Sequence, residues 1–181
     1  MKTNVAVFYG CRTVEHEVSI ISAVQAMRAI NRDKYDVTPV YVTKNGEMYT
    51  GDSLFTIEEY RTLPELLKKC KKVNFARENG KVLMKFESGG LFSKQKPVSV
   101  DVAFPVVHGT NCEDGTIQGF FEFLDLPYVG CDIISSAVGM DKAVFKDVLK
   151  NAGLPVLDCL CYRAREYMTD KENITKNILE K

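Results

Sequence analysis

The sequence lacks an excess of either charge. It has 24 basic and 24 acidic side chains in 181 residues, which gives a formal net charge of zero. A protein dedicated to nucleic acid or to an anionic membrane needs a basic surplus to hold phosphates, so both classes of partner are disfavoured. Any charged ligand must therefore be met by a few local side chains.

The sequence also lacks a long hydrophobic run near its N-terminus. The first apolar stretch, Val5 to Tyr9, is too short for the hydrophobic region of a signal peptide or for a membrane-spanning helix. We therefore expect a cytoplasmic protein with no membrane partner.

None of the six cysteines forms a C-x-x-C pair. A chain of this length buries a core without disulfide bonds, so free thiols in a reducing compartment are expected. The spacing of Cys159 and Cys161 favours packing on one face of a strand over zinc binding, because paired zinc ligands are usually separated by two or more residues. The sequence thus predicts no metal site.

The order of the hydrophobic patterns is that of an α/β protein. Residues 4–9 form a β-branched and aromatic run typical of a buried parallel strand, and residues 35–42 form a second strand. Between them, residues 17–31 show the apolar spacing of a helix. The three segments predict a βαβ unit, followed by a turn at Asn45-Gly46.

The rest of the chain mixes both kinds of element, and its length predicts one full domain and a remainder. The apolar residues of a helix that opens at Met140 are expected to face a core. The expected elements are a helix over 63–69, antiparallel pieces over 73–76 and 82–87, a strand over 102–107, a helix over 117–124 capped by Asp114 or Thr116, a short strand over 127–130, the helix from Met140 with buried Val144, Phe145, Val148 and Leu149, a strand over 156–162, and a last amphipathic helix.

Two polar loops follow predicted strands. The first runs from Gly10 to Ser19 and the second from His108 to Gly115. Because the carboxyl ends of parallel strands meet at one edge of a sheet, Glu15 and His108 are expected to face one pocket. Simpler roles stay open for both, since an acidic residue complements a helix dipole and a single histidine is often structural.

The first loop does not fit two well-known motifs. Cys11-Arg12 follows Gly10, so the second glycine of the dinucleotide-binding fingerprint is missing, which disfavours an NAD site. Ile20 stands where a zinc-protease motif would need a second histidine after His16.

Four segments together resemble the D-alanine–D-alanine ligases, members of the ATP-grasp carboxylate-amine ligases. They are residues 10–22 (GCRTVEHEVSIIS), 108–119 (HGTNCEDGTIQG), 127–130 (PYVG) and 136–146 (SAVGMDKAVFK). Their order and spacing are similar to the family's over essentially the whole chain. The resemblance implies a Rossmann-like, parallel-sheet pre-ATP-grasp domain over 1–130, followed by the beginning of an ATP-grasp central domain over 131–181.

The resemblance also implies a reaction that uses ATP and Mg²⁺. ATP phosphorylates the carboxylate of a first D-alanine, and the amino group of a second attacks the acyl phosphate to give a dipeptide for peptidoglycan. By resemblance, Glu15 holds the first substrate's ammonium group and His108 stabilises charge beside the reacting carboxyl group. Ser19 belongs to the same substrate-binding motif, and Lys142 matches a lysine that contacts the ATP phosphates.

The resemblance places the magnesium ligands and most of the ATP site beyond Lys181, so this chain alone is expected to be inactive. Alternatives are a relative that joins D-alanine to D-serine or D-lactate, and a binding or dimerisation module without catalysis. The family's N-terminal domain commonly contributes to a homodimer, for which the helix over 17–31 is a candidate interface. Cys11 and Cys112 stand where the family usually has glycine, so a positive φ at either would strain the chain.

Overall fold

The structure, a computed structural model, describes residues 2–87 and 95–181. It divides into two compact units, Met1–Met140 and Asp141–Lys181, and each is described by itself. The domain boundary expected after residue 130 stays a prediction. Within the described ranges, no helix is both long and apolar enough to cross a membrane.

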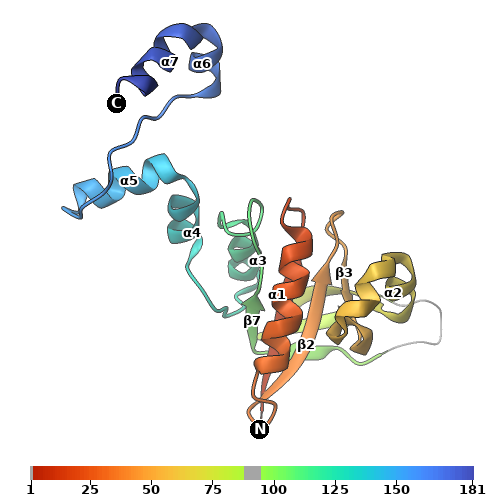
Figure 1. Cartoon of the computed structure of the whole chain (residues 1–181). Coiled ribbons are helices and arrows are strands. Elements are labelled where there is room, and N and C mark those ends of the chain that lie inside the picture. The colour runs from red at the N-terminus through yellow and green to blue at the C-terminus, as the bar shows by residue number, and fades with distance from the viewer. Residues whose placement is uncertain (1, 88–94) are drawn as a thin grey trace. The chain divides into compact units, whose positions relative to one another are not determined.

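A mixed sheet with the strand order β6-β5-β4-β3-β2-β1-β7 is the framework of the first unit (Figure 1). β1 pairs in parallel with β2 and with β7, while the pairs from β2 outward to β6 are antiparallel. The parallel part confirms the expected βαβ unit. The strands are β1 (Thr3–Gly10), β2 (Tyr35–Val42), β3 (Met48–Thr50), β4 (Lys71–Glu78), β5 (Lys81–Phe86), β6 (Val98–Val100) and β7 (Val102–Pro105).

The two faces of β1 belong to two different hydrophobic cores. Val5, Val7 and Tyr9 pack with α1, whereas Ala6 and Phe8 pack with α3. This alternation follows from the two-residue period of a strand and gives the first unit three layers. Its helices are α1 (His16–Ala29), α2 (Leu63–Lys69), α3 (Thr116–Leu124) and α4 (Ile133–Met140), with short 3₁₀ turns η1 (Asp52–Phe55) and η2 (Ile57–Thr62).

Most of the elements expected in this unit are confirmed. β2 and α2 have the bounds that the sequence predicts, and the turn at Gly46 joins β2 to the antiparallel β3. The short strand expected over 127–130 is reduced to a single parallel bridge between Ala103 and Tyr128. α4 has no counterpart in the sequence prediction.

The second unit consists of α5 (Lys142–Asn151), α6 (Ala164–Thr169) and α7 (Lys171–Leu179). The strand expected over 156–162 is wrong, because these residues are irregular and the unit has no neighbouring strand with which they would pair. The buried face expected for α5 is also wrong, since Val144, Phe145 and Val148 are exposed. Cys159 and Cys161 are exposed as well, which contradicts the expected core packing, although all six cysteines are free thiols as predicted.

Candidate active site

The register of the parallel strands brings the two predicted loops together. Val5 of β1 lies opposite Val102 of β7, and Phe8 lies opposite Pro105, so both strands end at the same edge of the sheet. The loop after β1 and the loop after β7 therefore begin side by side. This confirms that the two segments share one edge, where open α/β sheets bind ligands.

The first loop leaves β1 through a tight turn in the left-handed region. Gly10 has φ +89° and Cys11 has φ +69°. The Cys11 N–H donates to the Val42 carbonyl at 2.8 Å, and a Cβ on Gly10 would lie 2.4 Å from that oxygen. Cys11 thus takes the strained conformation that a glycine would adopt freely. Cys112 does not, because the positive φ values of the second loop belong to Gly109, Asn111 and Gly115.

The buried His16 side chain holds this turn in place through hydrogen bonds of both ring nitrogens. Its ring is 2% exposed, with Nδ1 2.6 Å from the Cys11 carbonyl oxygen and Nε2 2.8 Å from the Tyr41 hydroxyl. Because a carbonyl oxygen only accepts, Nδ1 carries the proton and Nε2 accepts from Tyr41. Sequence reasoning considered His16 only as a metal ligand and missed this role.

Ser19 lies beneath the loops and joins the ends of the two strands. Its hydroxyl accepts from the Gly10 N–H at 2.8 Å and donates to the Val106 carbonyl at 2.6 Å. The side chain is fully buried. Ser19 therefore belongs to the frame of the site, and its hydroxyl is already committed to backbone groups.

The second loop is folded by its own acidic side chains. The Gly109 N–H donates to Glu113 at 2.6 Å, and the Asp114 carboxylate accepts from the Asn111 and Thr116 N–H groups at 2.7 and 3.1 Å. Partial burial opposes ionisation of Asp114, but these hydrogen bonds prevail and hold its pKa below the usual value. The N-cap expected at Asp114 or Thr116 is wrong, because Gly115 occupies the N-cap position of α3. Asp114 precedes the N-cap and accepts from the N–H of Thr116, the first residue of the helix.

Glu15 and the backbone beside His108 approach each other across the edge of the sheet. A Cβ on Gly109 would lie 3.3 Å from Oε1 of Glu15 and 2.6 Å from Oγ1 of Thr13, so the carboxylate stands against the residue that follows His108. Glu15 is exposed, and the half-buried His108 places Nε2 3.1 Å from the Ser22 hydroxyl of α1. The Glu15 carboxylate thus lies beside the backbone that follows His108, and the expectation that the two side chains face one pocket stays a prediction.

The family model described as D-ala D-ala ligase N-terminus matches residues 4–131. The chain belongs to this D-alanine–D-alanine ligase family. A curated relative, the D-alanine–D-alanine ligase of Thermosipho melanesiensis, is 44% identical over 156 residues, which cover 86% of this chain and 41% of the relative.

Two solved structures of ligases share the fold at 30% identity. The D-alanine–D-alanine ligase of Coxiella burnetii has a TM-score of 0.77, and the VanG D-Ala:D-Ser ligase of Enterococcus faecalis has a TM-score of 0.73. Each match covers 99% of this chain and 49% of the other. The chain thus spans about half the length of the ligases that it matches.

Lys142 lies in the second unit, whereas Glu15 and His108 lie in the first. It stands exposed in the first turn of α5, next to Asp141, whose carboxylate caps the helix by accepting from the Ala143 and Val144 N–H groups. These two amides are therefore occupied. What Lys142 offers a phosphate is the point charge of its ammonium group.

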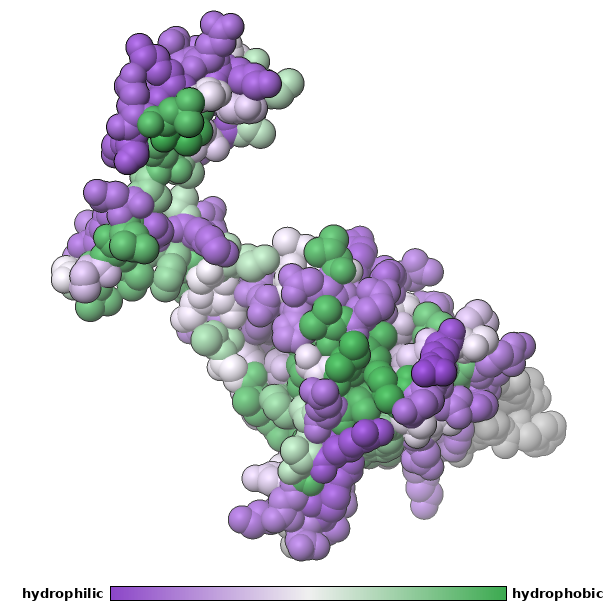
Figure 2. All heavy atoms as spheres, in the orientation of Figure 1, coloured by the Kyte–Doolittle hydropathy of each residue, from purple (hydrophilic) through white to green (hydrophobic). Residues whose placement is uncertain are grey.

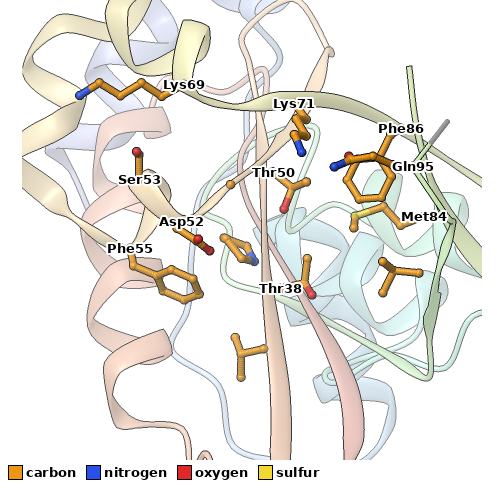
Figure 3. Close-up of a pocket in the computed structure, with 14 residues that line it drawn as sticks. Thr38, Thr50, Asp52, Ser53, Phe55, Lys69, Lys71, Met84, Phe86 and Gln95 are labelled. Carbon is orange, nitrogen blue, oxygen red and sulfur yellow. The ribbon is translucent and has the colours of Figure 1, made fainter. Parts of the chain in front are cut away.

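A cavity of about 570 Å³ in the ligase-family domain lies away from these loops (Figure 3). Its walls include Thr38 near the beginning of β2, Thr50 of β3 and Lys71 of β4, with none of the predicted site residues among the lining. This cavity is therefore separate from the predicted site residues. In residues 2–87 and 95–181, no cluster of three or more His, Cys, Asp or Glu side chains is arranged to hold a metal ion.

Proposed function

We propose that this chain is the N-terminal, substrate-binding part of an ATP-dependent ligase that joins two D-alanines through an acyl phosphate for peptidoglycan synthesis. The observation that carries the proposal is the placement of Glu15 against Gly109, directly beside His108. This pairing sits at the carboxyl edge of a parallel sheet in a chain of the ligase family. A cytoplasmic location accompanies the proposal, since ATP is one of the substrates.

Each side chain has a distinct role in this proposal. Glu15 accepts charge-assisted hydrogen bonds from the ammonium group of the first D-alanine. His108 donates toward its carboxyl group, where charge develops when the acyl phosphate forms. Ser19, whose hydroxyl is bonded to Gly10 and Val106, acts by holding both strand ends at the correct separation beneath the substrate.

ATP is proposed to meet this chain at Lys142, whose ammonium charge neutralises part of the phosphate charge. The Mg²⁺ that accompanies ATP is proposed to be held by residues outside this chain. On this account the chain alone has no ligase activity. Phosphate release that depends on both ATP and D-alanine, measured with the purified chain, would contradict it.

The role of Glu15 is tested by a pair of variants in the complete enzyme that contains this chain. Glu15→Gln removes the charge that faces the ammonium group, so it should raise the KM for the first D-alanine far more than the KM for ATP. Glu17→Gln is the matched control, because Glu17 is exposed two residues away and is paired with Lys44 at 2.7 Å. Equal rises in both KM values for Glu15→Gln, or a similar effect of Glu17→Gln, would count against the assignment.

A D-alanine–D-serine ligase is the alternative that one observation supports. The VanG D-Ala:D-Ser ligase and the D-alanine–D-alanine ligase from Coxiella burnetii are both 30% identical to this chain, so the identity to these two solved structures does not choose between the two second substrates. Competition assays of D-serine and D-lactate against labelled D-alanine in the complete enzyme decide the matter. Preferential incorporation of D-serine would replace D-alanine as the second substrate in the proposal.

We also propose that a second copy of the chain binds the outer face of α1. Val18 and Ile21 lie on α1 and are each 50% exposed, and Val14, in the turn just before the helix, is 89% exposed. Figure 2 shows apolar side chains gathered over α1. An exposed apolar stripe of this kind is typical of a protein–protein interface and suits a homodimer.

A further inference from the structure

Cys11 and Cys112 come from different loops and meet in the same buried cluster. Cys11 follows β1 directly, and Cys112 lies in the middle of the loop between β7 and α3. Both side chains are buried in the core on the α3 side of the sheet. The Asn111 side chain donates to the Arg12 carbonyl at 2.9 Å, so the residues next to the two cysteines are also fastened to each other.

The two thiols influence each other's ionisation. The neighbouring Cys112 thiol and burial both raise the pKa of Cys11. Their shared place in one buried cluster, and the hydrogen bond between the residues next to them, make Cys11 and Cys112 neighbours in space although both are free thiols.

A small molecule has a route to Cys11. A cavity of about 270 Å³ is lined by Cys11, Arg12 and Asn111 together with apolar side chains of α3. The other cysteines have different surroundings, since Cys70 is half-buried and Cys131, Cys159 and Cys161 are exposed.

We propose that Cys11 and Cys112 form a site of oxidative modification, at which a hydroperoxide converts the two thiols into a disulfide bond between the loops. In the first step hydrogen peroxide oxidises the Cys11 thiol to a sulfenic acid, and the second peroxide oxygen leaves as water. In the second step the Cys112 sulfur attacks Cys11 Sγ, the S–S bond forms, and the hydroxyl group leaves with the Cys112 proton as a second water. Two thiols thus lose two electrons to the O–O bond of one peroxide.

The bond would link the loop that carries Glu15 covalently to the loop that carries His108. It would therefore fix the separation of the two segments that form the candidate site, and reduction would release it. This inference concerns the thiols alone and does not depend on what the site binds.

The test uses a variant of this chain that keeps only the two cysteines of interest, made with Cys70→Ser, Cys131→Ser, Cys159→Ser and Cys161→Ser. The reduced protein is treated with hydrogen peroxide, unfolded, and labelled with an alkylating reagent before its intact mass is measured. We expect a product that has lost two hydrogen atoms and takes up no label, and reduction should restore two labels. Adding Cys11→Ser or Cys112→Ser gives the matched controls, which should not form this product.

Peptide mapping of the wild-type chain and thermal unfolding of the two-cysteine chain provide two further tests of the disulfide bond. If the four serine substitutions impair folding, digestion of the oxidised wild-type chain with trypsin and a glutamyl endoprotease separates Cys112 from Cys131 by cutting at Glu113. A Cys11–Cys112 cross-linked peptide supports the proposal. The thermal midpoint of the two-cysteine chain should also rise by several degrees on oxidation.

The chain has two histidines, one at the end of each loop segment, and their ring proton signals in NMR spectra report on both loops. Both signals should shift on oxidation of the two-cysteine chain and return on reduction. Recovery of two labels after peroxide treatment, conversion of the cysteines to sulfinic acids without a cross-link, or pairing of Cys11 with any other cysteine would overturn the proposal.

Discussion

At the scale of single residues, the first loop owes its shape to a side chain that packs behind it. His16 uses both ring nitrogens, one on the Cys11 carbonyl and one on the Tyr41 hydroxyl. It thereby satisfies a buried carbonyl in a turn whose own backbone is strained at Cys11. The position of Glu15, the preceding residue, depends on this anchor.

Replacement of His16 should therefore lower the free energy of unfolding more than replacement of its hydrogen-bond partner Tyr41. We expect His16→Ala to lower the free energy of unfolding by about 2–4 kcal/mol, because it opens a cavity and leaves the Cys11 carbonyl unpaired. Tyr41→Phe should cost about 1–2 kcal/mol, because it removes one hydroxyl and leaves the Cys11 contact in place. Urea unfolding measures both values, and equal losses would show that the Cys11 contact contributes nothing.

Asp114 should stabilise the second loop in a pH-dependent manner. We expect Asp114→Ala to cost about 1 kcal/mol at neutral pH, through loss of its hydrogen bonds to Asn111 and Thr116. Since its pKa in the folded state lies below the usual value, this stabilisation is present above the usual pKa and is lost as the pH falls through the folded-state pKa.

Urea unfolding at neutral pH and at a pH below ~3 checks this dependence on Asp114. The gap between wild type and Asp114→Ala should narrow in acid. The exposed Asp33 provides the control, since its carboxylate makes no hydrogen bond or ion pair within the part of the chain that the structure describes. A gap that is constant with pH, or an equal loss in Asp33→Ala, would contradict the assigned role.

The sequence predicts which residues reach the edge of the sheet, but it does not predict the long-range hydrogen bonds that hold those residues in position. Glu15 and His108 stand just beyond the ends of strands that hydrophobic runs identify, so the approach of Glu15 to the backbone beside His108 follows from the parallel register. The bond between His16 and Tyr41 joins residues 25 positions apart on different elements, which no local pattern encodes. Ser19 illustrates the same limit, because its hydroxyl bonds to Val106, which is 87 positions away in the sequence.

At the scale of elements, strands were predictable where a partner strand exists. β1 and β2 are β-branched runs that lie in the sheet, and the sequence locates both. Residues 156–162 have a similar composition but no adjacent strand within the second unit, so their backbone stays irregular. A hydrophobic pattern indicates a preference for extended backbone, whereas the hydrogen bonds of a strand need a neighbour.

The end of β1 should tolerate substitution far less than the neighbouring hairpin. Gly10 and Gly46 have similar φ values of +89° and +84°, but a Cβ on Gly10 would clash with Val42 whereas a Cβ on Gly46 would meet no atom within 4 Å. We expect Gly46→Ala to cost about 1 kcal/mol for the left-handed backbone alone. Gly10→Ala should cost more than about 3 kcal/mol, because the clash adds to the same backbone cost.

Thermal and urea unfolding of the two glycine variants separate these contributions. Gly10 and Gly46 have similar φ values, but only Gly10 has neighbouring atoms in the space that a Cβ would fill. The difference between the two losses of unfolding free energy therefore measures the close approach of Gly10 in β1 to Val42 in β2. Similar losses in both variants would show that the turn after β1 relaxes to accept a side chain.

At the scale of the whole molecule, the two units differ in how far they bury their apolar residues. The first unit encloses two cores on opposite faces of one sheet. In the second unit Ile174 is buried, while α5 and α7 leave most of their apolar side chains exposed. Amphipathic spacing correctly located these helices, but the prediction that α5 has a buried face needed an opposing surface that residues 141–181 do not provide.

The proposed homodimer gives the exposed stripe on α1 a partner, and one pair of variants tests it. Ile21→Glu places a charge within the stripe and should convert a dimer to a monomer, because each copy would have to bury that charge in the apolar interface. Val129→Glu is the control, since Val129 is 51% exposed and Ile21 is 50% exposed, yet Val129 lies outside α1.

Sedimentation velocity over a range of concentrations measures the outcome. Wild type and Val129→Glu should sediment as dimers at concentrations at which Ile21→Glu is monomeric. All three should have similar thermal midpoints, because surface substitutions of this kind usually change stability by less than about 0.5 kcal/mol. A wild-type chain that stays monomeric at every concentration would exclude this interface, and equal dissociation of both variants would place the contact elsewhere on the first unit.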